Sequence, residues 1–290
     1  MQALTGTGVA MVTPFDSNKN IDFPALGKLI DFLIEGGVEF LVTLGTTGET
    51  PVLSTEERKE IVAFTMNHVA GRLPVVVGIG GNDTRHILHE METFPLDQAA
   101  AILSASPYYN KPSQEGLYQH YQLVATHAPK PIIMYNVPGR TGRNIEADTT
   151  LRLAHEVGNI MGVKEASGNM DQCMRILRDR PKGFMVWSGD DNLALPQMAC
   201  GMDGVISVAA NAYPGEFSEM IRLCLKGSFE NSRIINNKLM MAYDLMFAEN
   251  NPAGIKAFLS EMGLIQNQLR LPLVSLSAPL MQKLQQYLGN

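Results

Sequence analysis

Cysteine is scarce in this chain, and the spacing of its cysteines excludes most roles for them. The 290 residues include three cysteines, Cys173, Cys200 and Cys224, with no pair at C-x-x-C spacing. An odd number of widely separated cysteines argues against a disulfide framework and against a zinc site, and it fits the reducing cytoplasm. We expect the three side chains to be small buried apolar groups.

Long apolar runs and excess positive charge are missing as well. No hydrophobic stretch approaches the roughly 20 residues that span a bilayer. The opening, MQALTGTGVAMVTPF, lacks the basic segment of a signal peptide. The formal net charge of −6 gives no attraction for nucleic acid or for an anionic membrane. We therefore expect a cytoplasmic protein that binds neither nucleic acid nor membranes.

What the chain does have is a regular alternation of short apolar runs with amphipathic helical patterns. Continuous apolar runs are typical of parallel strands that are covered on both faces. Strand–helix units with right-handed crossovers form either a doubly wound sheet or a closed barrel, and eight units favour an α/β fold of the (β/α)8 TIM barrel type. The eight runs lie at 6–15, 40–46, 74–80, 99–107, 131–138, 160–167, 184–191 and 204–211.

The helical patterns carry start signals and continue beyond the last strand. Ser54 and Glu57 stand at capping-box spacing before an amphipathic segment that runs to residue 71. After about residue 228 the strand pattern stops, and helical patterns follow at 229–250, 252–263 and 277–288. No low-complexity or charged linker precedes them. We expect a catalytic barrel at 1–228 and a C-terminal three-helix extension at 229–290 packed on it.

One lysine stands where a buried strand is expected. Lys164 lies inside the run IMGVKEAS, although lysine is almost never fully buried without a partner. Burial favours the neutral form of an amine, which can attack a carbonyl to form a Schiff base. The alternative is a structural ion pair with Glu165 or Glu49. Glu165 is the poorer partner, because adjacent residues of a strand face opposite ways.

Other candidate functional residues follow the expected strands, because active sites of such barrels lie at the C-terminal ends of the strands. Tyr135 is the candidate to move the proton that an iminium's neighbouring carbon must lose, with Thr46 and Tyr109 in a hydroxyl chain. The planar guanidinium of Arg140 suits a carboxylate. The alternatives are plain packing for the tyrosines and a surface location for Arg140. The same strand ends also carry Thr47, Glu49, Tyr108, Asn136, Asp190, Asp191, Ser207 and Asn211.

Three further motifs are better explained by structure than by a site. HILHE, residues 86–90, lacks the H-E-x-x-H arrangement of zinc enzymes, and we expect a solvated helix face there. GIGGN, residues 78–82, is not a dinucleotide-binding G-x-G-x-x-G. The acidic pair Asp190–Asp191 of GDDN is expected to cap a helix rather than to bind a metal. These motifs give no reason to expect a metal or a nucleotide cofactor.

Several spaced motifs, taken in order, resemble those of the dihydrodipicolinate synthase family. This pyruvate-dependent, class I aldolase-like group also contains N-acetylneuraminate lyase. The resemblance implies condensation of pyruvate with aspartate semialdehyde to 4-hydroxy-tetrahydrodipicolinate, an early intermediate of lysine and diaminopimelate biosynthesis. It also implies no cofactor beyond a lysine Schiff base. The motifs are GTTGE, PYYNKPSQEGLYQHY, YNVPGRTG, VKEASGN, SGDD, GVISVAAN and, in the helical tail, NPAGIKAFLSEMGL.

Catalytic roles follow from the same resemblance. Lys164 would form the Schiff base with pyruvate, and Tyr135 would donate and accept the proton. Thr46 would link Tyr135 to Tyr109. Tyr109 would reach in from a neighbouring subunit of a homotetramer built as a dimer of dimers.

Substrate binding is assigned in the same way. Thr47 and the Ile206 backbone would hold pyruvate, and Arg140 would bind the carboxylate of aspartate semialdehyde at the mouth of the site. Neuraminate lyases resemble GSTGE and lack the arginine after YN-x-P, so Thr46 and Arg140 favour the synthase. The alternatives are a sister pyruvate-dependent lyase that acts on a sugar acid or another keto acid, and a non-catalytic barrel.

One set of positions departs from the family pattern. Lysine-sensitive members bind lysine at a dimer interface through a set that includes two histidines and a glutamate. The matching positions here are Thr55, Arg58 and His86, beside retained Asn82 and Tyr108. Loss of the carboxylate removes the partner of the effector's ammonium group, and Arg58 adds like charge. We therefore expect inhibition by lysine to be weak or absent.

Overall fold

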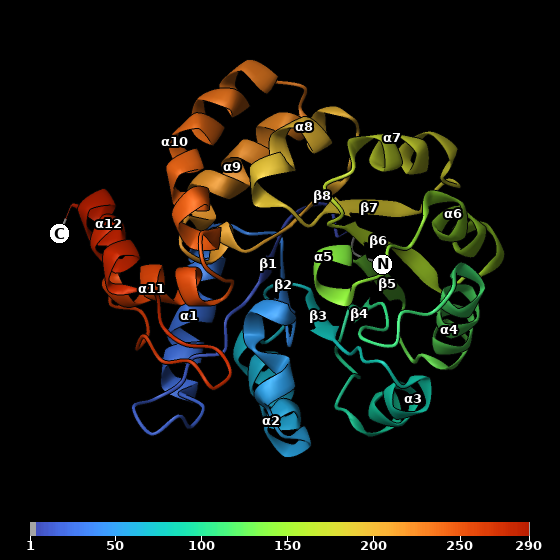
Figure 1. Cartoon of the computed structure of the whole chain (residues 1–290), viewed down its shortest axis with the longest axis horizontal. Helices are drawn as coiled ribbons and strands as arrows, with labels where there is room; N and C mark the ends of the chain where they lie inside the picture. The colour runs from blue at the N-terminus through green and yellow to red at the C-terminus, as the bar shows by residue number, and fades with distance from the viewer. Residues whose placement is uncertain (1–3, 290) are drawn as a thin grey trace.

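Eight parallel strands form a closed barrel in the order β1 to β8, and a ring of helices surrounds it (Figure 1). The structure is a computed structural model that describes residues 4–289. It confirms the predicted TIM barrel. Each strand begins at or just after the start of its predicted run and ends earlier, because the last residues of each run belong to the loop that follows. The strands are β1 (Gly6–Ala10), β2 (Phe40–Thr43), β3 (Val75–Gly78), β4 (Ala101–Ala105), β5 (Ile132–Asn136), β6 (Ile160–Glu165), β7 (Met185–Ser188) and β8 (Gly204–Ser207).

The helices alternate with the strands and then continue past them. The predicted capping box is confirmed at the start of α2: the Glu57 N–H donates to Ser54 Oγ at 3.2 Å, and the Ser54 N–H donates to Glu57 Oε2 at 2.9 Å. The helices are α1 (Phe23–Glu35), α2 (Thr55–Val69), α3 (Thr84–Thr93), α4 (Gln114–His127), α5 (Pro138–Thr141), α6 (Ala147–Glu156), α7 (Met170–Asp179), α8 (Ala194–Ala199) and α9 (Pro214–Leu225), with short 3₁₀ turns η1 (Thr46–Gly48), η2 (Thr50–Val52), η3 (Asp191–Leu193) and η4 (Ala209–Asn211).

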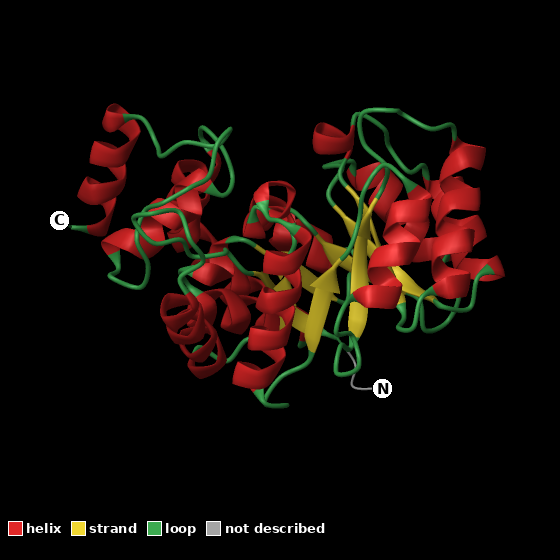
Figure 2. Ribbon diagram, turned by 90° about the horizontal axis from the view of Figure 1, so that it is seen from below, coloured by secondary structure: helices red, strands yellow, loops and turns green. Residues whose placement is uncertain are grey.

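Three more helices follow the barrel, at the positions that the sequence predicts. They are α10 (Phe229–Phe247), α11 (Ala253–Glu261) and α12 (Ala278–Leu288). Helix α10 packs against α8 and α9, helix α11 contacts α10 and the turn η4, and α12 lies outermost (Figures 1 and 2). We call these three helices and the segments between them the extension. The expected outer boundaries at residues 1 and 290 lie outside the described residues.

The barrel interior is a packed core. Trp187 is fully buried there, and its indole N–H donates to the Leu4 carbonyl at 2.6 Å. At Gly8 a Cβ atom would lie 2.1 Å from the Phe40 ring, so only glycine lets that ring fill the barrel. Ile206 belongs to the same apolar cluster, which fills the middle of the barrel between its two ends.

The cysteines are free, as their spacing predicts. Cys173 and Cys224 are buried, which confirms the expectation for them, whereas Cys200 is only half-buried. No helix among residues 4–289 combines the length and the hydrophobicity needed to cross a membrane. Within the same residues, no three His, Cys, Asp or Glu side chains are grouped so as to hold a metal ion.

Candidate active site

A cavity of about 170 Å³ lies at the carboxyl ends of the strands. About six water molecules of liquid volume would fill it, so it suits a ligand of a few heavy atoms. Strands β5 and β6, the loops after β2 and β7, helix α5 and the extension all contribute to its walls. The polar residues of the lining are Thr46, Thr47, Tyr135, Arg140, Lys164, Asp190 and Asn251.

Lys164 and Tyr135 are neighbours on one face of the barrel wall. The parallel register of β5 and β6 pairs the two residues directly. Lys164 is 4% exposed and Tyr135 is 7% exposed, and Lys164 Nζ lies 4.4 Å from the centre of the Tyr135 ring. At Gly189 a Cβ atom would lie 3.0 Å from Lys164 Cε, so the bare glycine backbone makes room for the lysine stem. The amine is sheltered from bulk water but faces the cavity.

The two carboxylates considered as structural partners of Lys164 are engaged elsewhere. Glu165 points to the opposite side of β6, where it accepts hydrogen bonds from Asn136 Nδ2 at 3.0 Å and from the Ser167 N–H at 2.8 Å. Glu49 forms a buried ion pair with Lys256. The alternative of a structural ion pair between Lys164 and either glutamate is therefore wrong.

Asp190 is the carboxylate that shares the cavity with Lys164. Burial raises the pKa of Asp190 to about 6, although the positive charge of Lys164 opposes this rise. Its Oδ2 atom is buried without a hydrogen-bond partner in the described structure. Asp190 and Asp191 stand at the start of the 3₁₀ turn η3, as predicted, but the predicted side-chain cap is absent. Asp190 precedes η3 without a side-chain capping bond, and Asp191 Oδ2 accepts instead from the N–H groups of Val208 and Ala209 at 3.0 and 2.9 Å.

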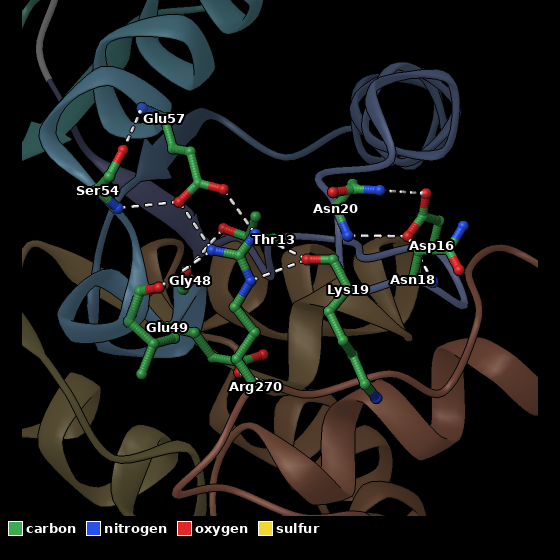
Figure 3. Close-up of polar contacts among 11 residues, drawn as sticks. Thr13, Asp16, Asn18, Lys19, Asn20, Gly48, Glu49, Ser54, Glu57 and Arg270 are labelled. Atoms are coloured by element: carbon green, nitrogen blue, oxygen red, sulfur yellow. Dashed lines mark hydrogen bonds and ion pairs between the residues drawn. The ribbon is translucent and has the colours of Figure 1, made fainter.

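The turn η1, Thr46–Gly48, places two threonines at the wall of the cavity. Thr47 is 2% exposed, and Asn251 Nδ2 donates to its Oγ1 at 3.0 Å. Thr13 Oγ1 donates to the Gly48 carbonyl at 2.7 Å (Figure 3). Glu49, which ends the turn, has a φ of 55°, a left-handed conformation that is uncommon for a residue with a side chain. Buried contacts thus fix this turn from two sides.

Arg140 lies at the mouth of the cavity, on the short helix α5. Its side chain is exposed, and Nη2 donates to the Asn251 carbonyl at 3.4 Å. A guanidinium group at this place can bind the carboxylate of an entering ligand.

Of the residues predicted to act in catalysis or substrate binding, two do not line this cavity. Tyr109 is 88% exposed and has a φ of 71°, so its ring projects away from the rest of its own chain. Ile206 is fully buried in the apolar cluster inside the barrel, so its side chain is part of the core. Tyr108, the neighbour of Tyr109, is 42% exposed.

The positions matched to the family's lysine-binding set form a different cluster. Arg58 Nη2 lies 2.5 Å from Glu90 Oε1, and His86 Nε2 lies 3.0 Å from the same atom. Glu90 is almost fully buried, so the prediction of a solvated face is right for His86 and wrong for Glu90. Thr55 Oγ1 accepts a hydrogen bond from Arg58 at 3.2 Å, and the Asn82 carbonyl accepts one from Asn110 Nδ2 at 2.9 Å. Arg58 is therefore already paired with a carboxylate.

The extension supplies residues that the sequence reasoning missed. Asn251 and Phe247 line the cavity, and Lys256 is fully buried behind the η1 turn. The only signal in the sequence is that the motif NPAGIKAFLSEMGL, which begins at Asn251, keeps the family pattern. Residues about 200 positions away from the turn they contact leave no local periodicity to detect.

Proteins of known family are similar to this chain over almost its whole length. Residues 3–290 match the model of the family described as "Dihydrodipicolinate synthetase family". The 4-hydroxy-tetrahydrodipicolinate synthase of Parabacteroides distasonis is 50% identical over 271 residues, which cover 93% of this chain and 91% of that protein. That of Flavobacterium psychrophilum is 46% identical over 284 residues, which cover 98% and 97%. The crystal structure of dihydrodipicolinate synthase from Thermotoga maritima has a TM-score of 0.96 at 40% identity, covering 99% and 98%. The chain belongs to the dihydrodipicolinate synthetase family.

Proposed function

We propose that the protein condenses pyruvate with aspartate semialdehyde through a Schiff base on Lys164. The product is 4-hydroxy-tetrahydrodipicolinate, for lysine and diaminopimelate biosynthesis, and the enzyme is a lyase that needs no cofactor beyond its own lysine. The observation that carries the proposal is the sheltered amine of Lys164 against the Tyr135 ring, in a cavity sized for a few heavy atoms.

The first half of the reaction prepares pyruvate as a nucleophile. Lys164 Nζ attacks the keto carbon, water leaves, and an iminium forms. The methyl carbon then gives up a proton and becomes the terminal carbon of an enamine. Tyr135 moves these protons, and Thr46 connects its hydroxyl to the partner subunit's Tyr109. Thr47 and the Ile206 backbone hold the pyruvate carboxylate.

The second half joins the two substrates and releases the enzyme. Arg140 binds the carboxylate of aspartate semialdehyde at the mouth, which orients its aldehyde toward the enamine. The enamine carbon attacks the aldehyde carbon, and the new alkoxide takes a proton to become a hydroxyl group. The substrate's own amine then attacks the iminium carbon, which closes the ring and breaks the bond to Lys164.

The assembly and location proposed here follow the same reasoning. We propose a homotetramer, a dimer of dimers, located in the cytoplasm, in which residues 1–228 form the catalytic barrel and residues 229–290 the extension. Tyr109 supports a crossing between subunits, because it is exposed at φ 71° and a non-glycine residue in the left-handed region often marks a functional site.

The test is turnover followed by identification of the reactive lysine. Pyruvate and aspartate semialdehyde are supplied to the protein, and product formation is coupled to dihydrodipicolinate reductase. Borohydride then traps pyruvate on the protein, and peptide mapping locates the adduct. Turnover with the adduct on Lys164 is expected. An adduct on Lys164 without turnover would move the acceptor to a sugar acid or another aldehyde, and no adduct would overturn the proposal.

A further inference from the structure

A buried ion pair ties the η1 turn to the extension. Glu49 directly follows the turn, and its side chain and that of Lys256 are both fully buried in contact with each other. Lys256 Nζ also donates to the Gln268 carbonyl at 2.9 Å, and the Arg270 N–H donates to Glu49 Oε2 at 3.1 Å. Every donor that these contacts bring to the Glu49 carboxylate therefore comes from the extension.

Such a pair is an expensive way to stabilise a fold. Removing two charges from water costs more than their mutual attraction commonly returns, and apolar residues of the same size often stabilise a core as well. A buried ion pair with further hydrogen bonds does impose one geometry, because each oxygen has a fixed donor. Here the amine of Lys256 also lies 4.1 Å from the centre of the Phe15 ring, which closes the remaining side.

The ion pair constrains the backbone of the turn that carries the two threonines. The Glu49 N–H donates to the Thr46 carbonyl at 3.1 Å and so closes the η1 turn. At the other end of the same short segment of the extension, Asn251 Nδ2 donates to Thr47 Oγ1. Helix α11 and the residues just before it thus contact the turn at two successive points.

We infer that the Glu49–Lys256 ion pair positions the two threonine hydroxyls for the reaction by fixing the η1 turn against helix α11. The inference rests on the proposed function, in which Thr46 serves Tyr135 and Thr47 serves pyruvate. Glu49 and Lys256 are not among the residues that line the cavity, so they act through the turn and are positioning residues. The extension is then a working part of the active site.

The deciding variant replaces both charges at once. Glu49→Gln/Lys256→Met keeps the two shapes and leaves no unpaired buried charge, so a folded protein is expected. We expect kcat at least tenfold lower and the pyruvate KM at least fivefold higher. The KM for aspartate semialdehyde is expected to stay within twofold, because neither Glu49 nor Lys256 contacts Arg140.

A matched control exists in the same region. Arg270 joins the extension to α2 through two hydrogen bonds to Glu57, at 2.6 and 2.7 Å, without touching the turn with its side chain (Figure 3). Glu57→Gln/Arg270→Met is expected to lower Tm and to leave kcat and both KM values within twofold. A purely structural role for Glu49–Lys256 predicts the same outcome for both double variants.

Two further measurements decide the remaining cases. If the first double variant does not fold, Glu49→Asp replaces it, since it keeps both charges and shortens the reach by one methylene; the same kinetic loss is expected. A folded variant of either kind with wild-type kcat and pyruvate KM overturns the inference. Half-saturation of borohydride trapping by pyruvate gives the same readout without aspartate semialdehyde. A wild-type protein inactive toward that substrate would overturn the proposed function and still leave this inference testable.

Discussion

The two buried lysines of this protein stand in opposite environments. Lys256, on α11, is fully buried, and its amine is matched by the Glu49 carboxylate and the Gln268 carbonyl. Lys164, on β6, is nearly as deeply buried, but its amine faces the Tyr135 ring and an open cavity. Burial is common to both, so burial alone does not make a nucleophile. The difference lies in whether the amine has fixed partners or free space in front of it.

Replacing Lys164 tests whether its amine is the nucleophile. Lys164→Ala is expected to reduce turnover to background, because the remaining groups cannot form the covalent intermediate. The fold is expected to survive, since no fixed ionic partner is left behind. Coupled turnover and circular dichroism on the same preparation check both points. Residual activity above one tenth of wild type would contradict the assignment.

Replacing Lys256 tests whether its amine serves the stability of the fold. Lys256→Met leaves the Glu49 carboxylate buried without its cation, so we expect the free energy of unfolding to fall by about 3–5 kcal/mol. Urea titration measures this change. Borohydride trapping on Lys164 is expected to persist in the folded fraction. An unchanged unfolding midpoint would show that Glu49 finds another partner or loses its charge.

Asp190, the carboxylate that shares the cavity with Lys164, should make the stability of the protein depend on pH. Because the folded-state pKa of Asp190 is raised to about 6, the folded protein holds this proton more tightly than the unfolded chain does. The stability that the proton contributes is fully present below about pH 4 and is lost as the pH rises through 6. The side-chain amide of Asp190→Asn does not ionise, so the variant does not lose this stability as the pH rises. We expect the variant to gain about 1–3 kcal/mol over wild type between pH 4 and pH 7. Urea titrations at both values test this, and a pH-independent difference would contradict it.

The smallest effect is expected at the surface cluster of Arg58 and His86. The buried Glu90 carboxylate already faces Arg58 and His86, so it is not free to pair with an added ammonium group. We expect 1 mM lysine to leave turnover within twofold of the value without lysine. Glu90→Gln serves as the comparison, because it removes the paired charge without changing the shape. Strong inhibition of the wild-type protein below 1 mM would contradict this account.

The sequence predicted what depends on local pattern. Eight apolar runs predicted the eight strands, and Lys164 stood out because a charge interrupts one of these runs. The capping box at Ser54 was legible for the same reason, since its parts are three residues apart. The positions of Thr46, Tyr135 and Arg140 after predicted strands also predicted that they lie together, and all three line the cavity.

What the sequence did not predict depends on contacts between distant segments. A lysine within a predicted helix is ordinarily a surface residue, whereas Lys256 is buried against Glu49, 207 positions earlier. The Asn251 contact with Thr47 spans 204 positions. Asp191 was expected to cap its own helix and instead bonds the loop after β8. The role proposed for Tyr109 requires a second chain, which one sequence does not place.

The most direct test of the contrast between the two lysines is the location of the trapped pyruvate. The wild-type protein is treated with pyruvate and borohydride, digested, and mapped by mass spectrometry. The account predicts one modified peptide, containing Lys164, and an unmodified peptide containing Lys256. An adduct on Lys256, or none on Lys164, would contradict it.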